Sequence, residues 1–148
     1  MLSPPRLLGH FRQAPRQEQP IGADRAADSL DIVRSVNVTR DIVVAERVVW
    51  ATGAAKRRGL LGRDHLDKHE GMYLVPCQWI HMFGMQFPID VAFLGRDGRV
   101  LALHHGLAPN RLSRPVLRAE GALELAAGVL RATGTRVGDI IDLQDPEE

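Results

Sequence analysis

The side chains best suited to chemistry lie together in one stretch, CQWIHMFGMQFPID, which spans residues 77–90. Cys77 is the only cysteine of the chain, and His81 and Met85 follow it at equal intervals. On a helix these three side chains would fall within an arc of about 80°. On a strand their even spacing would also place them on one face. Gly84 interrupts regular elements, so the shared face requires the segment to be regular.

Three interpretations of this stretch remain open. A thiolate, an imidazole and a thioether form a soft ligand set suited to copper(I). A cysteine nucleophile with His81 as base would be an enzymatic site, in which Asp90 could be the third, orienting group. Cysteine and methionine are also common core residues, and Trp79, Phe83 and Phe87 give the stretch a core-like character. We favour this last interpretation, in which His81 is a hydrogen-bonded, partly buried residue that lines a pocket or fixes the loop.

Asp90 is a carboxylate within an apolar strand pattern, PIDVAFL. In a strand it faces the side opposite Ile89 and Val91, and it needs hydrogen-bond donors if that side is buried. One alternative is local: Asp90 orders the turn after Pro88 by accepting hydrogen bonds from backbone N–H groups.

The other alternative joins Asp90 to the stretch before it. We expect His81 and Asp90 to form one polar cluster with Arg58 or Arg63 at the edge of an apolar pocket, since buried polar side chains need partners. Such a pocket would suit a small polar ligand. The residues expected around it are His81, Asp90, Arg58, Arg63, Cys77 and Met85.

The charged residues do not indicate nucleic acid or a membrane as a partner. The formal net charge is only +1, so the whole chain creates no strong field. The basic run KRRGLLGR, residues 56–63, is followed by Asp64 and Asp67, and no aromatic residues are interleaved with it. No apolar run reaches the roughly 20 residues of a membrane helix. We therefore expect neither partner, and we assign no metal and no cofactor.

The first half of the chain predicts strands around one short helix. The stretch DIVVAERVVW, residues 41–50, is rich in β-branched residues and predicts one or two strands. Residues 52–62 predict a short helix with Thr52 as its N-cap and Gly62 as its stop. A polar loop, residues 64–71, leads to a strand over residues 72–76.

The second half contains the clearest local signal. Two apolar stretches, IDVAFL and RVLALH, flank GRDG at residues 95–98, which predicts a β-hairpin. Residues 119–125 predict a strand, residues 126–133 a helix, and residues 137–143 a last strand. Strands outnumber helices and do not alternate with long helices. The expected fold is therefore a β-rich α+β domain, with a mostly antiparallel sheet or a partly closed barrel and two short helices.

The ends of the chain differ in composition from this domain. Residues 1–31 are rich in proline and poor in large apolar side chains, so we expect a disordered extension. The domain would span residues 32–143, with a frayed acidic tail over residues 144–148. One cysteine excludes an internal disulfide. Since no secretory signal or transmembrane segment is seen in the sequence, we expect a cytoplasmic protein.

Three groups of motifs resemble the DUF192 family, a domain of unknown function that is widespread in prokaryotes. They are RGLLGR (residues 58–63) with GMYL from Gly71, IHMFGMQFPIDVAFL (residues 80–94) with GRV from Gly98, and ALELAAG (residues 122–128) with VGD from Val137. The resemblance covers roughly residues 35–143. The chain departs from the family pattern at Met82, where a small hydroxyl residue is usual, and at Gly95, where aspartate is frequent.

The resemblance implies a compact β-rich fold but no established reaction, substrate or cofactor. The residues favour a non-catalytic small-ligand-binding or accessory domain, with a pocket bounded by residues 77–90, Gly59 and Gly62. The alternatives are an enzyme that uses Cys77, His81 and Asp90, and a copper-binding protein that uses Cys77, His81 and Met85.

Overall fold

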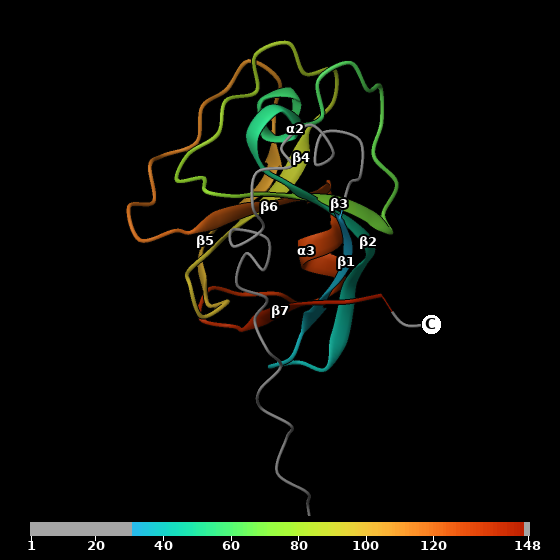
Figure 1. Ribbon diagram of the computed structural model, residues 1–148, viewed down its shortest axis with the longest axis vertical. Helices are drawn as coiled ribbons and strands as arrows, with labels where there is room; N and C mark the ends of the chain where they lie inside the picture. Colours follow the sequence, from blue (N-terminus) through green and yellow to red (C-terminus); the bar gives the residue numbers. More distant parts are fainter. Residues whose placement is uncertain (1–30, 147–148) are drawn as a thin grey trace, which may run out of the picture.

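The computed structural model describes residues 31–146, and these residues form seven strands and two short helices (Figure 1). The elements in chain order are β1 (Asp31–Asn37), β2 (Ile42–Ala51), α2 (Gly53–Arg58), β3 (Glu70–Leu74), β4 (Ile89–Leu94), β5 (Val100–Leu107), β6 (Gly121–Ala126), α3 (Val129–Ala132) and β7 (Ile141–Gln144). The expected N-terminal extension lies outside the described residues, except that β1 already begins at Asp31. Similarly, Gln144 belongs to β7 and not to a frayed tail.

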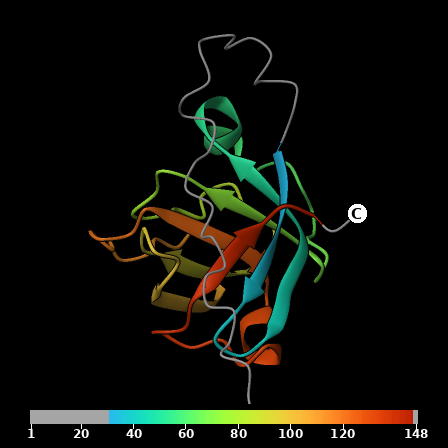
Figure 2. The same ribbon diagram turned by 60° about the horizontal axis from the view of Figure 1, so that its bottom comes forward.

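The strands form one mixed sheet in the order β5-β4-β6-β3-β2-β1-β7. Only the β2–β3 pair is parallel, and each of the other neighbouring pairs is antiparallel. The sheet curls, as Figures 1 and 2 show, so its two edge strands approach each other. Backbone hydrogen bonds join them at one end: Val100 donates to Asp139 at 2.8 Å, and Ile141 donates to Gly98 at 2.9 Å. The expectation of a β-rich, partly closed barrel with two short helices is confirmed.

Hydrophobic cores lie on both faces of this curled sheet. The concave face packs around Val129 and Leu130 of α3, together with Leu123 and Leu125 of β6. The convex face is covered by α2 and by the segment between β3 and β4. Because both faces are buried, β4 carries buried side chains at every position. A strand of this kind lacks the polar alternation of a half-exposed sheet.

The expected hairpin is present as β4 and β5. Its turn is closed by backbone hydrogen bonds from Gly98 to Gly95 at 2.9 Å and from Gly95 to Arg99 at 2.8 Å. Arg96 and Asp97 are exposed at the tip. Gly98 has a φ of 84°, a conformation that glycine adopts without steric cost.

The two helices are shorter than expected, and backbone conformation explains where they begin and end. Helix α2 stops at Arg58 because Gly59 adopts a φ of 52°, so Gly62 is not its terminal residue. Thr52 precedes the helix but makes no capping hydrogen bond with its side chain. Helix α3 begins only at Val129 because Gly128, with a φ of 96°, cannot continue a helix.

The last strand also begins later than expected, at Ile141 and not at residue 137. Asp139 instead accepts hydrogen bonds from Arg40 at 2.6 Å, from Asn37 at 2.9 Å and from the backbone N–H of Arg136 at 2.9 Å. Burial by itself would raise the pKa of Asp139, but these hydrogen bonds outweigh it and the pKa is lowered. The turn before β7 is therefore ordered by an ionised carboxylate.

The helices offer no membrane span. Within residues 31–146, none is both long enough and apolar enough to cross a bilayer.

Candidate functional site

The segment between β3 and β4, residues 76–88, is an irregular cover on the convex face. It is held against the loop after β5, where Met82 donates a backbone hydrogen bond to Arg111 at 2.8 Å. An antiparallel bridge also pairs His81 with Leu112. The segment is thus neither a helix nor a regular strand, but its backbone is fixed at several points.

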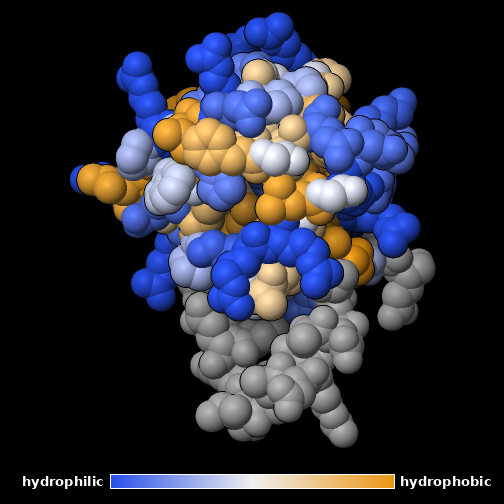
Figure 3. Space-filling view, turned by 90° about the horizontal axis from the view of Figure 1, so that it is seen from above, coloured by the Kyte–Doolittle hydropathy of each residue, from blue (hydrophilic) through white to orange (hydrophobic). Residues whose placement is uncertain are grey.

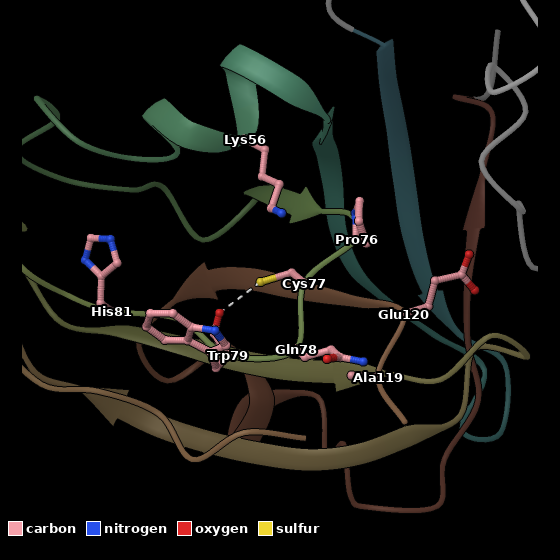
Figure 4. A pocket seen from close by; sticks show the side chains of 8 residues that line it. All are labelled: Lys56, Pro76, Cys77, Gln78, Trp79, His81, Ala119 and Glu120. Carbon is pink, nitrogen blue, oxygen red and sulfur yellow. Dashed lines mark hydrogen bonds between the residues drawn. The ribbon is translucent and has the colours of Figure 1, made fainter. Parts of the chain in front are cut away.

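Two adjoining cavities open between this segment and α2. One, of about 450 Å³, is shown in Figure 4, where Lys56 extends from α2 toward the sulfur of Cys77. The other, of about 390 Å³, reaches deeper, down to the sheet. The residues common to both linings are Lys56, Cys77, Trp79 and His81.

The structure places Cys77, His81, Met85 and Arg58 around the deeper cavity, and Gly59 lines it as well. The co-facing of the first three does not come from a regular element. Cys77 is buried and His81 is exposed, so their shared cavity results from how the irregular segment winds over the sheet.

Cys77 is not arranged as an activated nucleophile. Its thiol donates a hydrogen bond to the backbone oxygen of Trp79 at 3.2 Å (Figure 4). Burial raises the pKa of the Cys77 thiol, and this effect outweighs the lowering of that pKa by the backbone of Trp79 and the charge of Lys56. The thiolate, which is the form that attacks electrophiles and binds metals, is therefore disfavoured.

Arg63 does not reach the cavity. Its guanidinium lies 3.2 Å from the carboxylate of Glu70, at the start of β3. Gly62 is likewise absent from the lining. The chain leaves the cavity after Leu61, which is the last residue before β3 in the lining.

The expected cluster of His81 and Asp90 is wrong. Asp90 is fully buried, and it faces the concave side of the sheet, where α3 packs. Its carboxylate accepts three backbone hydrogen bonds, from Gly106 at 2.8 Å, from Gly128 at 3.0 Å and from Leu130 at 3.0 Å. Residues 106, 128 and 130 are distant in sequence, so the local alternative of a turn after Pro88 is wrong too.

This finding assigns Asp90 a structural role. It ties the end of β5 and the beginning of α3 to β4, because its two oxygens bond N–H groups of both. The pattern did predict that Asp90 faces away from Ile89 and Val91, which lie in the core of the convex face. What it could not supply was the identity of the donors.

Glu124, the most deeply buried titratable group in the lining of the cavity, was not predicted as a site residue from the sequence. Glu124 lies on β6 opposite Met72 of β3 and Val91 of β4, so it sits in the middle of the sheet. Glu124 is buried, with only 5% of the residue exposed. Within the described residues, its Oε1 atom has no hydrogen-bond partner. Burial raises the pKa of Glu124 to about 7.

A signal for Glu124 was present in the sequence. The strand pattern GALELA places one glutamate between Leu123 and Leu125. This is the same anomaly as Asp90 in IDVAFL, a carboxylate in an otherwise apolar strand. A single acid in an apolar strand therefore indicates a buried carboxyl group, which must accept hydrogen bonds from donors or remain protonated.

The opposite side of the cavity is basic. Lys56, Arg57 and Arg58 belong to the last turn of α2 and line the cavity together with Leu60, Leu61 and Ile80. The arrangement is therefore a largely apolar hollow with a carboxyl at its base and cations at its rim. Among residues 31–146, no three His, Cys, Asp or Glu side chains form a group that could hold a metal ion.

Sequence comparison identifies the family. The chain matches the DUF192 family, described as "Uncharacterized ACR", over residues 36–143. The chain belongs to the DUF192 family. No curated protein matches it.

Two solved structures of bacterial proteins resemble this DUF192 domain. A protein of unknown function from Novosphingobium aromaticivorans has a TM-score of 0.65 and 25% identity, over 76% of this chain and 84% of that chain. A proposed transcription regulator from Sinorhizobium meliloti has a TM-score of 0.65 and 22% identity, over 78% of this chain and 94% of that chain. Both share the fold, and neither supplies a reaction.

Proposed function

We propose that this DUF192 domain binds a small organic acid in the cavity between α2 and β6. The observation that carries the proposal is Glu124, a buried carboxyl group with an unpartnered Oε1 atom at the base of a cavity of about 390 Å³. A buried polar atom without a partner costs stability, and an incoming ligand atom can supply the missing hydrogen bond. The volume falls within the range of small-molecule sites, about 300–1,000 Å³.

The charges around the cavity favour an acid over an amine. A pKa of about 7 leaves Glu124 protonated in much of the population at neutral pH, and a protonated carboxyl can donate a hydrogen bond to a ligand oxygen. Lys56, Arg57 and Arg58 at the rim attract an anionic group. The apolar lining suits a short hydrocarbon body.

The catalytic alternative has less support. Asp90 lies on the other face of the sheet, and Cys77 has a raised pKa. The copper alternative meets the same obstacle at Cys77, because the soft ligand is the thiolate.

We propose that the protein is located in the cytoplasm, which suits a chain with a single buried thiol. Cell fractionation tests this.

The proposal is tested by thermal unfolding in the presence of a panel of short monocarboxylic acids, with the corresponding amines and alcohols for comparison. A ligand at about 100 times its Kd should raise the free energy of unfolding by about 2.7 kcal/mol, which is several degrees for a domain of this size. We expect acids alone to raise the melting temperature. Their effect should weaken above pH 7, where ionised Glu124 repels them.

Two variants locate the site. Glu124→Gln keeps a hydrogen-bond donor and should retain binding without the pH dependence, whereas Glu124→Leu should abolish binding. Arg96→Ala, at the exposed hairpin tip, is the control and should bind normally. Acids that act equally on wild type and Glu124→Leu, or a panel without any active acid, would refute the proposal.

A further inference from the structure

A ladder of exposed rings crosses the cover segment, residues 76–88. Trp79, His81 and Phe83 occupy alternate positions of the chain, and Phe83 lies in the turn in which Met85 donates a backbone hydrogen bond to Met82 at 3.2 Å. The centroids of Trp79 and His81 lie 6.2 Å apart, and those of His81 and Phe83 lie 5.4 Å apart with the rings stacked. Trp79 is 52% exposed and Phe83 is 51% exposed. Half of each of these two large apolar side chains is therefore exposed to water, whereas most large apolar side chains among residues 31–146 are buried or partly buried.

The ladder lies within a face of strongly uneven charge. Three segments, residues 53–63, 76–88 and 107–120, contain seven lysines and arginines but only one acid, Glu120, a net charge of +6. The chain as a whole has a net charge of +1, so its remaining residues carry −5. The seven cations are Lys56, Arg57, Arg58, Arg63, Arg111, Arg114 and Arg118.

These three segments meet in space and form one face, which we call the loop face. Backbone hydrogen bonds join the second and third, for example from Ser113 to Ile80 at 2.9 Å. The first and second enclose the cavities described above. Figure 3, which views the molecule from this side, shows apolar side chains in the middle of the face and hydrophilic ones around them.

We propose that the loop face binds single-stranded nucleic acid. Proteins that do so combine aromatic side chains, on which bases stack, with a positively charged surface along the backbone. The ladder provides the aromatic side chains, and the separation of its rings is comparable to that of successive nucleotides in an extended strand. The arginines of the loop after β5 provide the positively charged surface, next to the ladder, since Arg111 and Leu112 pair with Met82 and His81.

The kind of cation distinguishes this partner from an anionic lipid surface, which exposed apolar and basic side chains could also bind. Six of the seven cations are arginine. Arginine binds phosphate oxygens in a bidentate manner and stacks on planar rings, whereas attraction to a lipid surface requires only the charge. The ladder likewise offers exposed ring faces, with Trp79 and His81 tilted by 47° to each other. Bases stack on such faces, whereas lipid chains do not need them.

This inference reverses the expectation from sequence that nucleic acid is not a partner. That expectation used the small net charge and the lack of aromatic residues within the basic run at residues 56–63. In the folded chain, the aromatic rings come from residues 76–88 and lie beside Lys56. The arginines of residues 107–120 lie next to the same rings. In the sequence, 17 of the 18 acids of the chain lie outside the three segments that form the loop face.

The test is fluorescence anisotropy with a short labelled oligothymidylate and the matching oligouridylate, between about 50 and 200 mM salt. Each phosphate contact contributes about 0.7 to the slope of log K against log salt for single strands. The triple variant Arg111→Ala, Arg114→Ala, Arg118→Ala should therefore lower the magnitude of the slope by about 2. Phe83→Ala should weaken binding roughly 5-fold or more through lost stacking, with the slope unchanged.

The controls are Arg96→Ala and Arg131→Ala, two exposed arginines outside the loop face, which should bind like the wild type. Phe83 and the three arginines do not line the cavities, so this result is independent of the small-ligand proposal. Phe83 is half exposed, and a melting curve of each variant verifies that it folds.

Three outcomes would overturn the inference. The first is no binding of either oligonucleotide at the lowest salt. The second is full affinity in the folded Phe83→Ala variant, which would show that the ladder does not contribute to binding. The third is stronger binding to phosphatidylserine vesicles than to the oligonucleotides, which would assign the loop face to a membrane.

Discussion

Two buried carboxylates decide the chemistry of this domain at the scale of single residues. Asp90 and Glu124 lie on neighbouring strands, β4 and β6, but on opposite faces of the sheet. Asp90 has three backbone donors, whereas the Oε1 atom of Glu124 has none among the described residues. The first therefore has a structural role, and the second is the group to which the function proposed above assigns the ligand.

Replacing Asp90 should destabilise the domain strongly. Asp90→Ala leaves three buried N–H groups without their acceptor, so we expect the free energy of unfolding to fall by at least about 3 kcal/mol. His81→Ala, an exposed position, should cost less than about 1 kcal/mol. The two residues share no partner, so the double variant should equal the sum within about 0.5 kcal/mol. Urea denaturation measures all three, and a coupling larger than this would restore a direct link between them.

Glu124 should make stability depend on pH. Its pKa is 4.5 in an unfolded reference and about 7 in the folded protein, so the folded state holds more protons between these values. The stabilisation is complete below about pH 4.5 and is lost as pH rises through 7. From pH 5 to 8 the loss from this group amounts to at most about 3 kcal/mol.

The matching variants separate Glu124 from the other titrating groups. Glu124→Gln cannot ionise, so this part of the pH dependence should disappear from its denaturation curves. Glu46→Gln makes the same chemical change at an exposed position and should leave the dependence as in the wild type. Equal pH profiles for all three proteins would show that Glu124 titrates as an ordinary surface carboxyl.

The elements of this fold depend on glycines at a few turns. The hairpin of β4 and β5 turns through Gly98, which has a positive φ, whereas Arg96 in the same turn only faces solvent. The two helices begin or end where Gly59 and Gly128 take positive φ values. Local backbone conformation therefore fixes the lengths of the elements more sharply than side-chain propensity does.

A pair of substitutions in the hairpin turn tests this. Arg96→Ala should change the free energy of unfolding by less than about 0.5 kcal/mol, as at other exposed sites. Gly98→Ala, in the same turn, should cost about 1–2 kcal/mol because a side chain is strained at positive φ. Thermal or chemical denaturation compares the two. A large loss for Arg96→Ala would show that its side chain has a partner.

At the scale of the whole molecule, both proposed binding sites lie on one of the two faces of the sheet. The concave face holds α3 and is closed by contacts between the edge strands. The convex face carries the cover segment, the cavities and the loop face.

The domain should not need residues 1–30 for its stability. A shortened chain that starts at Asp31 keeps β1 whole, and the removed residues are poor in apolar side chains. We expect its melting temperature to change by less than about 3 °C, which corresponds to less than about 1 kcal/mol in a domain of this size. A chain that starts at Ile42 lacks β1, which pairs with both β2 and β7, and should not fold. A loss of many degrees in the first chain would contradict this expectation.

The sequence by itself determined the local features of this protein. Alternating and β-branched residues predicted the strands, GRDG predicted the hairpin, and the family motifs identified DUF192. These features depend on neighbours a few residues apart, so a pattern can carry them. The spacing of Cys77, His81 and Met85 is also a local feature, and it indicated residues 77–85 as a stretch rich in reactive side chains.

Only the tertiary structure decided which of these side chains act together. Asp90 finds its donors at Gly106 and Leu130, and Glu124 meets Lys56 across a cavity, through contacts between residues far apart in the chain. Arg58 reaches that cavity and Arg63 does not, although both belong to one basic run. The curl of the sheet and the path of the cover segment set these distances, and they arise from the packing of the whole chain, which no short stretch of sequence specifies.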